Sequence, residues 1–201
     1  FHFSFVDHLD NRWKQFATTI VGSNGRGCGL VYLHTPVGIY FDDQNQMIYI
    51  ADYNNHRIVG WRLNENNARI MAGGNGKGNR LDQLNRPTDV IIDRQNNDLI
   101  IADAGNRRVM RWSPHSNSSP QIIIGDIDCA RLAMHVDGSL YVSDYKNDEV
   151  KRWKKGERHG TIVAGGNGKG DRWTQLCAPR GVLVGQSGQI YVVDRDNHRV
   201  M

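Results

Sequence analysis

The 201-residue sequence lacks the features that mark a membrane protein or a metalloprotein. Its apolar runs fall well short of the roughly 20 residues that a helix needs to cross a bilayer, so we expect no membrane segment in this chain. Only three cysteines are present, an odd number without a C-x-x-C pair or the spacing of metal ligands. We interpret Cys28, Cys129 and Cys177 as free thiols, with room for at most one disulfide.

Several signals of compartment and of catalysis are also missing. The sequence has neither a starting methionine nor a charged leader before an apolar segment, so it predicts no localisation. It contains no G-x-S-x-G nucleophile motif and no window with helical periodicity. A formal charge of +4 is compatible with an acidic partner such as nucleic acid but is too small to indicate one.

What the sequence has is a repeat. The stretch "IYIADYNNHRIVGW" at 48–61 returns as "LIIADAGNRRVMRW" at 99–112, as "LYVSDYKNDEVKRW" at 140–153 and as "IYVVDRDNHRVM" at 190–201. Self-similarity at a period of 41 to 51 residues indicates a modular array. A catalytic group is needed once, so we interpret a residue that recurs in every unit as structural. Each unit before the last closes with a tryptophan: Trp61, Trp112 and Trp153, with Trp13 closing an earlier unit.

Each unit is predicted to form four short strands. In the unit that begins at residue 37, alternating Val, Ile, Tyr and Trp occupy 37–42, 47–52, 57–63 and 68–73, separated by Asn, Asp and Gly. Four strands in about 40 to 50 residues is the signature of a β-propeller blade. The sequence therefore predicts an all-β propeller.

The connections between units repeat as well. "GSNGRGCGLVYLHTP" (22–36), "GGNGKGNRLDQLNRP" (73–87) and "GGNGKGDRWTQLCAP" (165–179) run from glycine to proline with the same spacing. Glycines supply the positive φ of a tight exit turn, and a leucine in each (33, 84 and 176) is expected to tuck underneath. These linkers lack the Ser or Thr that a phosphate-binding P-loop requires after its lysine. Their cations, Arg26, Lys77 and Lys169, are candidates for a basic ring on one face.

An aspartate and an arginine five residues apart recur at the end of the second predicted strand. Because the carboxylate can accept hydrogen bonds from the following turn and the guanidinium can fork onto it, we interpret each pair as a structural device. The pairs are Asp52 with Arg57, Asp103 with Arg108, and Asp194 with Arg199.

The third complete unit departs from this pattern. Its linker is reduced to "GDIDC", and Asp144 meets Glu149 where the other units have arginine. The resulting group of Asp144, Asp148 and Glu149 is acidic. A solvated face is the favoured interpretation of this group, with a weak cation site as the alternative.

At "IADYNNHRIVGW" and "VVDRDNHRVM" the sequence resembles the NHL-repeat family, whose core tripeptide stands here as "NHR" at 55–57 and 197–199. The resemblance covers essentially the whole chain and implies a propeller, most often of six blades. About four and a half blades are present: a partial blade over 1–22, blades over about 37–73, 88–125 and 130–166, and a partial blade over 180–201. Since an open arc leaves unpaired strand edges, we expect 1–201 to be one propeller segment of a longer protein.

The resemblance implies a non-catalytic scaffold that binds a macromolecular partner, a protein before RNA, and requires no cofactor. The working surface is predicted to be the turn face, where side chains differ between otherwise equivalent blades. Its candidate residues are Tyr53, Asn54, Arg107, Tyr145, Lys146 and Arg195.

Three alternatives remain open. Tyr53 and Tyr145 beside Arg107 and Arg195 are suited to stacking on single-stranded RNA and neutralising it, which makes an RNA-binding propeller the first alternative. The second is a metal-dependent lyase resembling peptidylglycine amidating lyase, although the histidines fall at unrelated blade positions and supply no converging ligand set. The third is a structural or adhesion module of the kind that related propellers form in matrix and receptor proteins.

Overall fold

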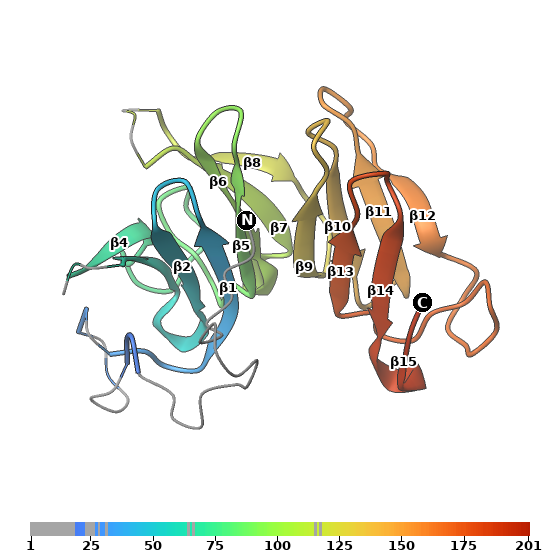
Figure 1. Ribbon diagram of the computed structural model, residues 1–201. Coiled ribbons are helices and arrows are strands. Elements are labelled where there is room, and N and C mark those ends of the chain that lie inside the picture. The colour runs from blue at the N-terminus through green and yellow to red at the C-terminus, as the bar shows by residue number, and fades with distance from the viewer. Residues whose placement is uncertain are drawn as a thin grey trace, which may run out of the picture.

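The computed structural model describes residues 19–22, 27, 29–30, 32–63, 65, 67–114, 116 and 118–201. In these residues the chain is built from β-strands, and helical structure is limited to three short 3-10 turns (Figure 1). The prediction of an all-β propeller is therefore confirmed. The partial blade expected over 1–22 lies almost wholly outside the described residues, as does Trp13.

The strands form four antiparallel sheets, and in each sheet strands that follow one another in sequence pair with one another. We refer to the sheets as blades 1 to 4. Blade 1 contains β1 (Pro36–Asp42), β2 (Met47–Asp52), β3 (Arg57–Arg62) and β4 (Ala68–Gly73). Blade 2 contains β5 (Asp89–Asp93), β6 (Asp98–Asp103), β7 (Arg108–Trp112) and β8 (Gln121–Ile124). Blade 3 contains β9 (Cys129–Met134), β10 (Leu140–Asp144), β11 (Glu149–Trp153) and β12 (Thr161–Gly165). Blade 4 contains β13 (Gly181–Val184), β14 (Ile190–Asp194) and β15 (Arg199–Val200).

In blades 1, 2 and 4 a 3-10 turn joins the second strand to the third, and all three turns lie at the lower ends of the sheets in Figure 1. They are η1 (Tyr53–Asn55), η2 (Ala104–Asn106) and η3 (Arg195–Asn197). Each ends at a residue in the left-handed conformation, namely His56, Arg107 and His198. The shared geometry coincides with the short polar sequence that recurs here, in which an asparagine is the last residue of each 3-10 turn.

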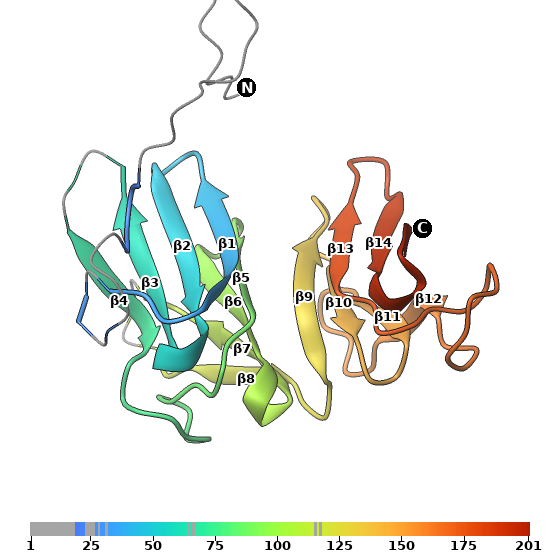
Figure 2. The same cartoon turned by 90° about the horizontal axis from the view of Figure 1, so that it is seen from below.

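The first strand of each blade lies at the inside of the arc. The four inner strands contact one another in the order β1, β5, β9, β13, and the remaining strands of each blade extend outward (Figure 2). The sheets thus pack face to face around a common axis, which is the arrangement of a propeller. The expectation of six blades stays a prediction.

Apolar side chains from facing sheets form the core. Blade 1 contributes Tyr49, Ala51 and Ile58, which cluster with blade 2 residues Val90, Leu99 and Ile101. Blade 2 contributes Ile100, Ala102 and Val109 from its other face, which cluster with Leu132, Leu140 and Val142 of blade 3. Each sheet is therefore apolar on both faces, which accounts for the near-continuous hydrophobic runs in its second strand.

The face of blade 4 that points away from blade 3 is also apolar, but it is not buried. Tyr191, Val193 and Val200 occupy the places that Ile100, Ala102 and Val109 hold in blade 2. The blade 2 residues are fully buried, whereas the three residues of blade 4 are 49, 44 and 68% exposed. This sheet presents to solvent an apolar face of the kind that blades 1 to 3 bury.

The linkers return the chain from an outer strand to the next inner strand. Gly73 ends β4 with a φ of +69°, and a Cβ at this position would lie 2.6 Å from the His56 carbonyl oxygen, so glycine is required there. Leu84 and Leu176 are buried beneath their linkers, as predicted, whereas Leu33 is half-buried. In blade 3 the connection from Ile124 to Cys129 has no such loop, in agreement with the shortened sequence.

Two of the repeated tryptophans pack between neighbouring blades. Trp112 packs against the cluster between blades 1 and 2, and Trp153 belongs to the cluster between blades 2 and 3. Trp61, which pairs with Ile48 across β2 and β3, is half-buried.

Candidate functional site

The recurring aspartate and arginine form an ion pair in three blades. The Nε–Oδ2 distances are 2.8 Å for Arg57 and Asp52, 2.7 Å for Arg108 and Asp103, and 2.8 Å for Arg199 and Asp194. All three aspartates are completely buried. The arginine thus supplies a charge that compensates a buried carboxylate, which would otherwise be costly to fold.

The other oxygen of each aspartate holds the preceding linker. Asp52, Asp103 and Asp194 accept the backbone N–H groups of His34, Asn85 and Cys177, at distances of 2.6 to 2.7 Å from Oδ1. The arginine continues this connection: Arg108 donates to the carbonyl oxygens of Asn79, Arg80 and Gln83. The pair is therefore a clamp that fixes the long linker to the turn of the blade that follows it.

An asparagine completes the clamp; from the sequence we noted it only as the first residue of "NHR" in two units and gave it no structural role. Asn106 donates to Asp103 and to the Gly78 carbonyl oxygen, and Asn55 and Asn197 make the matching contacts in blades 1 and 4. Its recurrence three residues after every repeat aspartate was the available signal. Burial raises the pKa of Asp103, although N–H groups of Asn85, Arg108 and Asn106 oppose this effect. At Asp194 burial acts in the same direction but is outweighed by hydrogen bonds from Asn197, Cys177 and Arg199, so its pKa is lowered.

Blade 3 has neither the repeat arginine nor the long linker that this arginine holds in the other blades. The linker that the arginine would hold is absent, and Glu149 instead pairs with Lys151 at 2.6 Å. The interpretation of this acidic group as a solvated face is wrong for Asp144 and Glu149, which are 1 and 6% exposed because the neighbouring sheets cover them. Asp144 accepts hydrogen bonds from Asn147, and Asp148 accepts the Ala178 N–H of the next linker. In the part of the chain that the structure describes, no group of three or more His, Cys, Asp or Glu side chains is placed to hold a metal ion.

The residues that we assigned to the turn face from the sequence are Tyr53, Asn54, Arg107, Tyr145, Lys146 and Arg195. Two of its tyrosines lie beneath arginines of the linkers: the Arg86 guanidinium is 5.8 Å from the Tyr53 ring centroid, and Arg180 is 4.8 Å from that of Tyr145. Arg86 and Arg180 flank the linker prolines, and sequence reasoning missed both. Asn54 donates to Thr35 Oγ1 at 2.9 Å.

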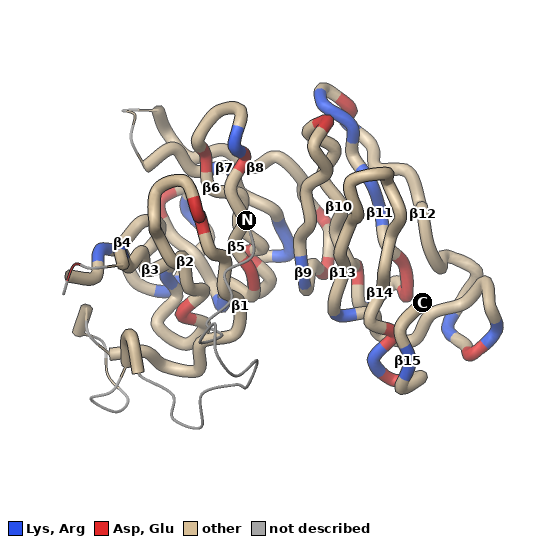
Figure 3. Tube along the Cα trace, viewed as in Figure 1, with Lys and Arg blue, Asp and Glu red and all other residues tan. Residues whose placement is uncertain are grey.

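The cations of the turn face are paired with acids. Asp128 is buried between Arg107 at 3.3 Å and Lys146 at 2.9 Å, and Arg195 contacts Asp196 at 2.7 Å. Figure 3 shows both signs of charge interspersed around these turns. The Asp128 contact raises the pKa of Lys146, so this lysine stays charged at neutral pH. The turn face is therefore polar and largely balanced in charge.

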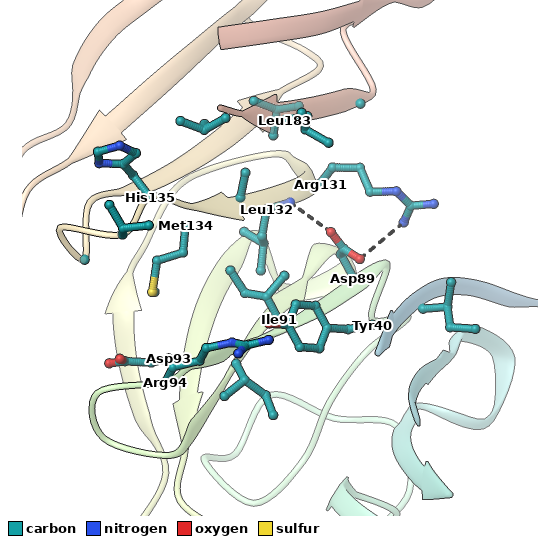
Figure 4. A pocket seen from close by; sticks show the side chains of 18 of the residues that line it. Tyr40, Asp89, Ile91, Asp93, Arg94, Arg131, Leu132, Met134, His135 and Leu183 are labelled. Atoms are coloured by element: carbon teal, nitrogen blue, oxygen red, sulfur yellow. Dashed lines mark hydrogen bonds and ion pairs between the residues drawn. The ribbon is translucent and has the colours of Figure 1, made fainter. Parts of the chain in front are cut away.

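A groove of about 720 Å³ lies between the inner strands (Figure 4). Ile39, Ile91 and Leu183 contribute apolar surface, and Asp89 and Arg131 are its polar pair. Burial raises the pKa of Asp89 to about 6, opposed by the Leu132 N–H and by Arg131.

Arg131 joins three blades at the edge of this groove. Its guanidinium lies 3.9 Å from Asp89 and donates to the Thr88 carbonyl oxygen and, at 2.8 Å, to that of Val37. At the other end of the groove Arg94 contacts Asp43 at 2.5 Å. Because the groove arginines already have partners within the protein, their charges are largely committed to holding the inner strands together.

No helix in the described ranges is both long enough and apolar enough to traverse a bilayer.

Comparison with known proteins identifies the repeat and the fold. The family model of the NHL repeat matches residues 33–61 and 176–200. The Arabidopsis thaliana protein "SUPPRESSOR OF QUENCHING 1, chloroplastic" is 20% identical over 199 residues, which cover 82% of this chain and 19% of that protein. The chain thus spans about a fifth of the length of this relative.

Solved structures share the fold at low sequence identity. The match to a chain in the structure of a nidogen/laminin complex covers 85% of this chain and 60% of that chain, with a TM-score of 0.67 and 18% sequence identity. The match to an auxiliary nutrient binding protein from Bacteroides thetaiotaomicron VPI-5482 covers 81% of this chain and 46% of that chain, with a TM-score of 0.62 and 13% sequence identity. The match to a streptogramin B lyase covers 82% of this chain and 50% of that chain, with a TM-score of 0.57 and 10% sequence identity. These similarities establish the propeller architecture alone.

Proposed function

The chain belongs to the NHL-repeat family, and from this premise we propose that it is a non-catalytic scaffold that binds a protein partner through its turn face. A propeller of this family fits a binding role because its sheets form a rigid support and its turns gather on one side (Figure 1). The partner and the residues that contact it belong to the proposal.

One observation carries the proposal. The residue after the repeat aspartate has the same place in every blade, yet it is Tyr53, Ala104, Tyr145 and Arg195 in turn. The aspartates before these residues are all at most 1% exposed. A constant buried support that carries different side chains at equivalent surface positions is what recognition of a non-repetitive partner requires.

The charge balance of the turn face favours a protein over RNA. Binding to a phosphate backbone draws on cations that are free to displace counterions. Here Asp128 engages Arg107 and Lys146, and Asp196 engages Arg195. A mixed surface with two tyrosines resembles the polar and aromatic composition of protein interfaces.

The experiment is affinity capture from cell extract with the wild-type chain and a variant carrying Tyr53→Ala, Tyr145→Ala and Arg195→Gln. We expect a protein that the wild type retains and the turn-face variant loses. The matched control is Gln44→Ala, an exposed position in the turn between β1 and β2 on the opposite side. Equal retention by the turn-face variant and by the control would reject the turn face as the binding surface.

The same preparation tests the alternatives. A randomised single-stranded RNA pool at two salt concentrations would reveal tight, steeply salt-dependent binding if RNA were the partner. The central groove is where a lyase would act, and stoichiometric, tightly held zinc in the purified protein would count against a non-catalytic role. We expect neither result.

A further inference from the structure

The three long linkers expose a large apolar side chain at the same position. Leu30, Leu81 and Trp173 are 45, 46 and 86% exposed. Each follows the glycine-rich part of its linker, and the equivalence follows from the shared spacing between first glycine and proline. Trp173 stands out because tryptophan offers the largest apolar surface of any residue and is here almost fully in water.

This exposure does not arise from the open face of blade 4. Blade 2 has blades on both sides, and Leu81 of its linker is nevertheless exposed, whereas the blade 2 counterparts of Tyr191 and Val193 are completely buried. A neighbouring blade therefore covers the sheet faces and leaves this linker position in solvent. Trp173 occupies the position equivalent to Leu81, a linker position that stays exposed even between two blades.

The Trp173 loop, which we define as residues 165–179, is held rigidly. Gln175 donates from its side chain to the Asn167 carbonyl oxygen at 3.0 Å, and Asn167 donates to that of Thr174 at 3.0 Å. Arg199 binds the Arg172 and Gln175 carbonyl oxygens from below, at 3.0 and 2.9 Å. Because these contacts fix the backbone on both sides of Trp173, a partner that binds it meets a largely preorganised loop.

The charge beside the apolar side chain differs between the linkers at 73–87 and 165–179. In the linker of blade 2, Arg80 forms an ion pair with Asp82 at 2.9 Å, across Leu81. In the Trp173 loop the corresponding residues are Arg172 and Thr174, so the acid is missing. Among the described residues no acidic side chain lies within ion-pair distance of Arg172. The loop thus presents a tryptophan next to a cation without a counter-ion.

We propose that the Trp173 loop is an anchor for a protein partner: Trp173 inserts into an apolar pocket of the partner, and Arg172 pairs with a carboxylate at the rim of that pocket. Tryptophan and arginine are the residues that most often dominate the binding energy of protein interfaces. The proposal rests on the scaffold function above and names the anchor and the chemistry of the partner.

Nucleic acid and membrane surfaces fit the loop less well. Asp171 precedes Arg172 in the sequence without forming an ion pair with it, and Asp196 lies within electrostatic range of Lys169, so anionic phosphates or lipid headgroups would also meet negative charge. The other two linkers offer leucine instead of an aromatic ring, which removes the successive stacking platforms of a single-strand binder. One aromatic anchor with one unpaired cation matches a discrete pocket on a protein.

The test is selection of short random peptides displayed on phage against the wild-type chain, followed by titration of synthesised peptides into Trp173→Ser, Arg172→Ser and Leu81→Ser variants. We expect enriched peptides that combine apolar and acidic residues. Their affinity should fall about tenfold or more for Trp173→Ser and for Arg172→Ser, and remain unchanged for Leu81→Ser. Peptides that bind all variants equally, or no enrichment at all, would overturn the proposal.

Two further measurements keep the result interpretable. The difference in fluorescence between the wild type and Trp173→Phe isolates the emission of Trp173, which should shift to shorter wavelength when a selected peptide is added. Circular dichroism melts of each variant establish that the fold is retained. The proposal would also be rejected if the wild type bound vesicles of anionic lipid or single-stranded RNA instead of peptides and if the Trp173→Ser variant lost that binding.

Failure of this inference is distinguishable from failure of the scaffold function. A cellular protein that is lost from the turn-face variant but captured equally by Trp173→Ser would retain the scaffold and reject the anchor. A protein lost from Trp173→Ser and kept by the turn-face variant would place the interface at the Trp173 loop.

Discussion

Arg108 Nε donates to Asp103 Oδ2 at 2.7 Å in the interior of the protein, and the remaining N–H groups of Arg108 reach three carbonyl oxygens of the linker from blade 1. A single side chain thereby joins the turn of one blade to the connection that leads into it. Blade 3 lacks both the linker and the arginine. The joint loss supports the interpretation that holding the linker is the task of this arginine.

Replacement of this arginine is the first prediction. Arg108→Met leaves the Asp103 carboxylate buried without its counter-charge and frees three linker carbonyls, so the free energy of unfolding should fall by about 3 to 5 kcal/mol. Arg69→Met, at a site that is 72% exposed, should change it by less than about 0.5 kcal/mol. Urea denaturation of both variants measures the difference, and a similar small effect at both positions would contradict a clamp.

Introducing the repeat arginine into blade 3 should lower the stability of the protein. Glu149→Arg places a guanidinium beside Asp144, but the linker carbonyls that satisfy Arg108 have no equivalent there. It also removes the 2.6 Å contact with Lys151. We expect the free energy of unfolding to drop by about 1 to 3 kcal/mol because buried donors are left unpaired. A stabilised variant in thermal melts would show that the ion pair alone, without the linker, is sufficient.

Asp89 should make stability depend on pH. Its pKa is raised from 3.8 to about 6 by burial, so the folded state binds the proton more tightly than the unfolded state. Its contribution is therefore favourable at low pH and is lost as the pH rises from about 4 to 6. Relative to Asp89→Asn, the wild type should lose about 2 to 3 kcal/mol over this interval. Urea titrations of both proteins at a series of pH values test this; a constant difference would refute it.

Cys129 should be unreactive in the folded protein. Its thiol is completely buried and donates to the Arg108 carbonyl oxygen, and burial strongly raises its pKa, so little thiolate forms near neutral pH. Iodoacetamide labelling followed by peptide mass spectrometry should modify Cys129 only after denaturant is added. Rapid labelling of the native chain at this residue would indicate frequent opening between blades 2 and 3.

The predicted turn face shows where sequence reasoning stopped. Differences between equivalent residues were visible in the repeat, and they identified Tyr53, Tyr145 and Arg195 as surface candidates. The contacts that balance this surface come from residues far away in sequence, since Arg86 lies over Tyr53 and Asp128 between Arg107 and Lys146. No local pattern specifies such partners, because they are brought together by the packing of one blade against the next.

The sequence by itself determined the repeat, the all-β class and the pairing of aspartate with arginine, because alternation, turn residues and spacing act over a few neighbouring positions. Only the tertiary structure decided that Arg108 holds a linker, that Asp89 meets Arg131 across two blades, and that Trp173 stays in solvent while Val109 is buried. These outcomes depend on which faces meet when the sheets pack around their axis. Burial and charge compensation are set by that packing, and residues close in sequence do not control it.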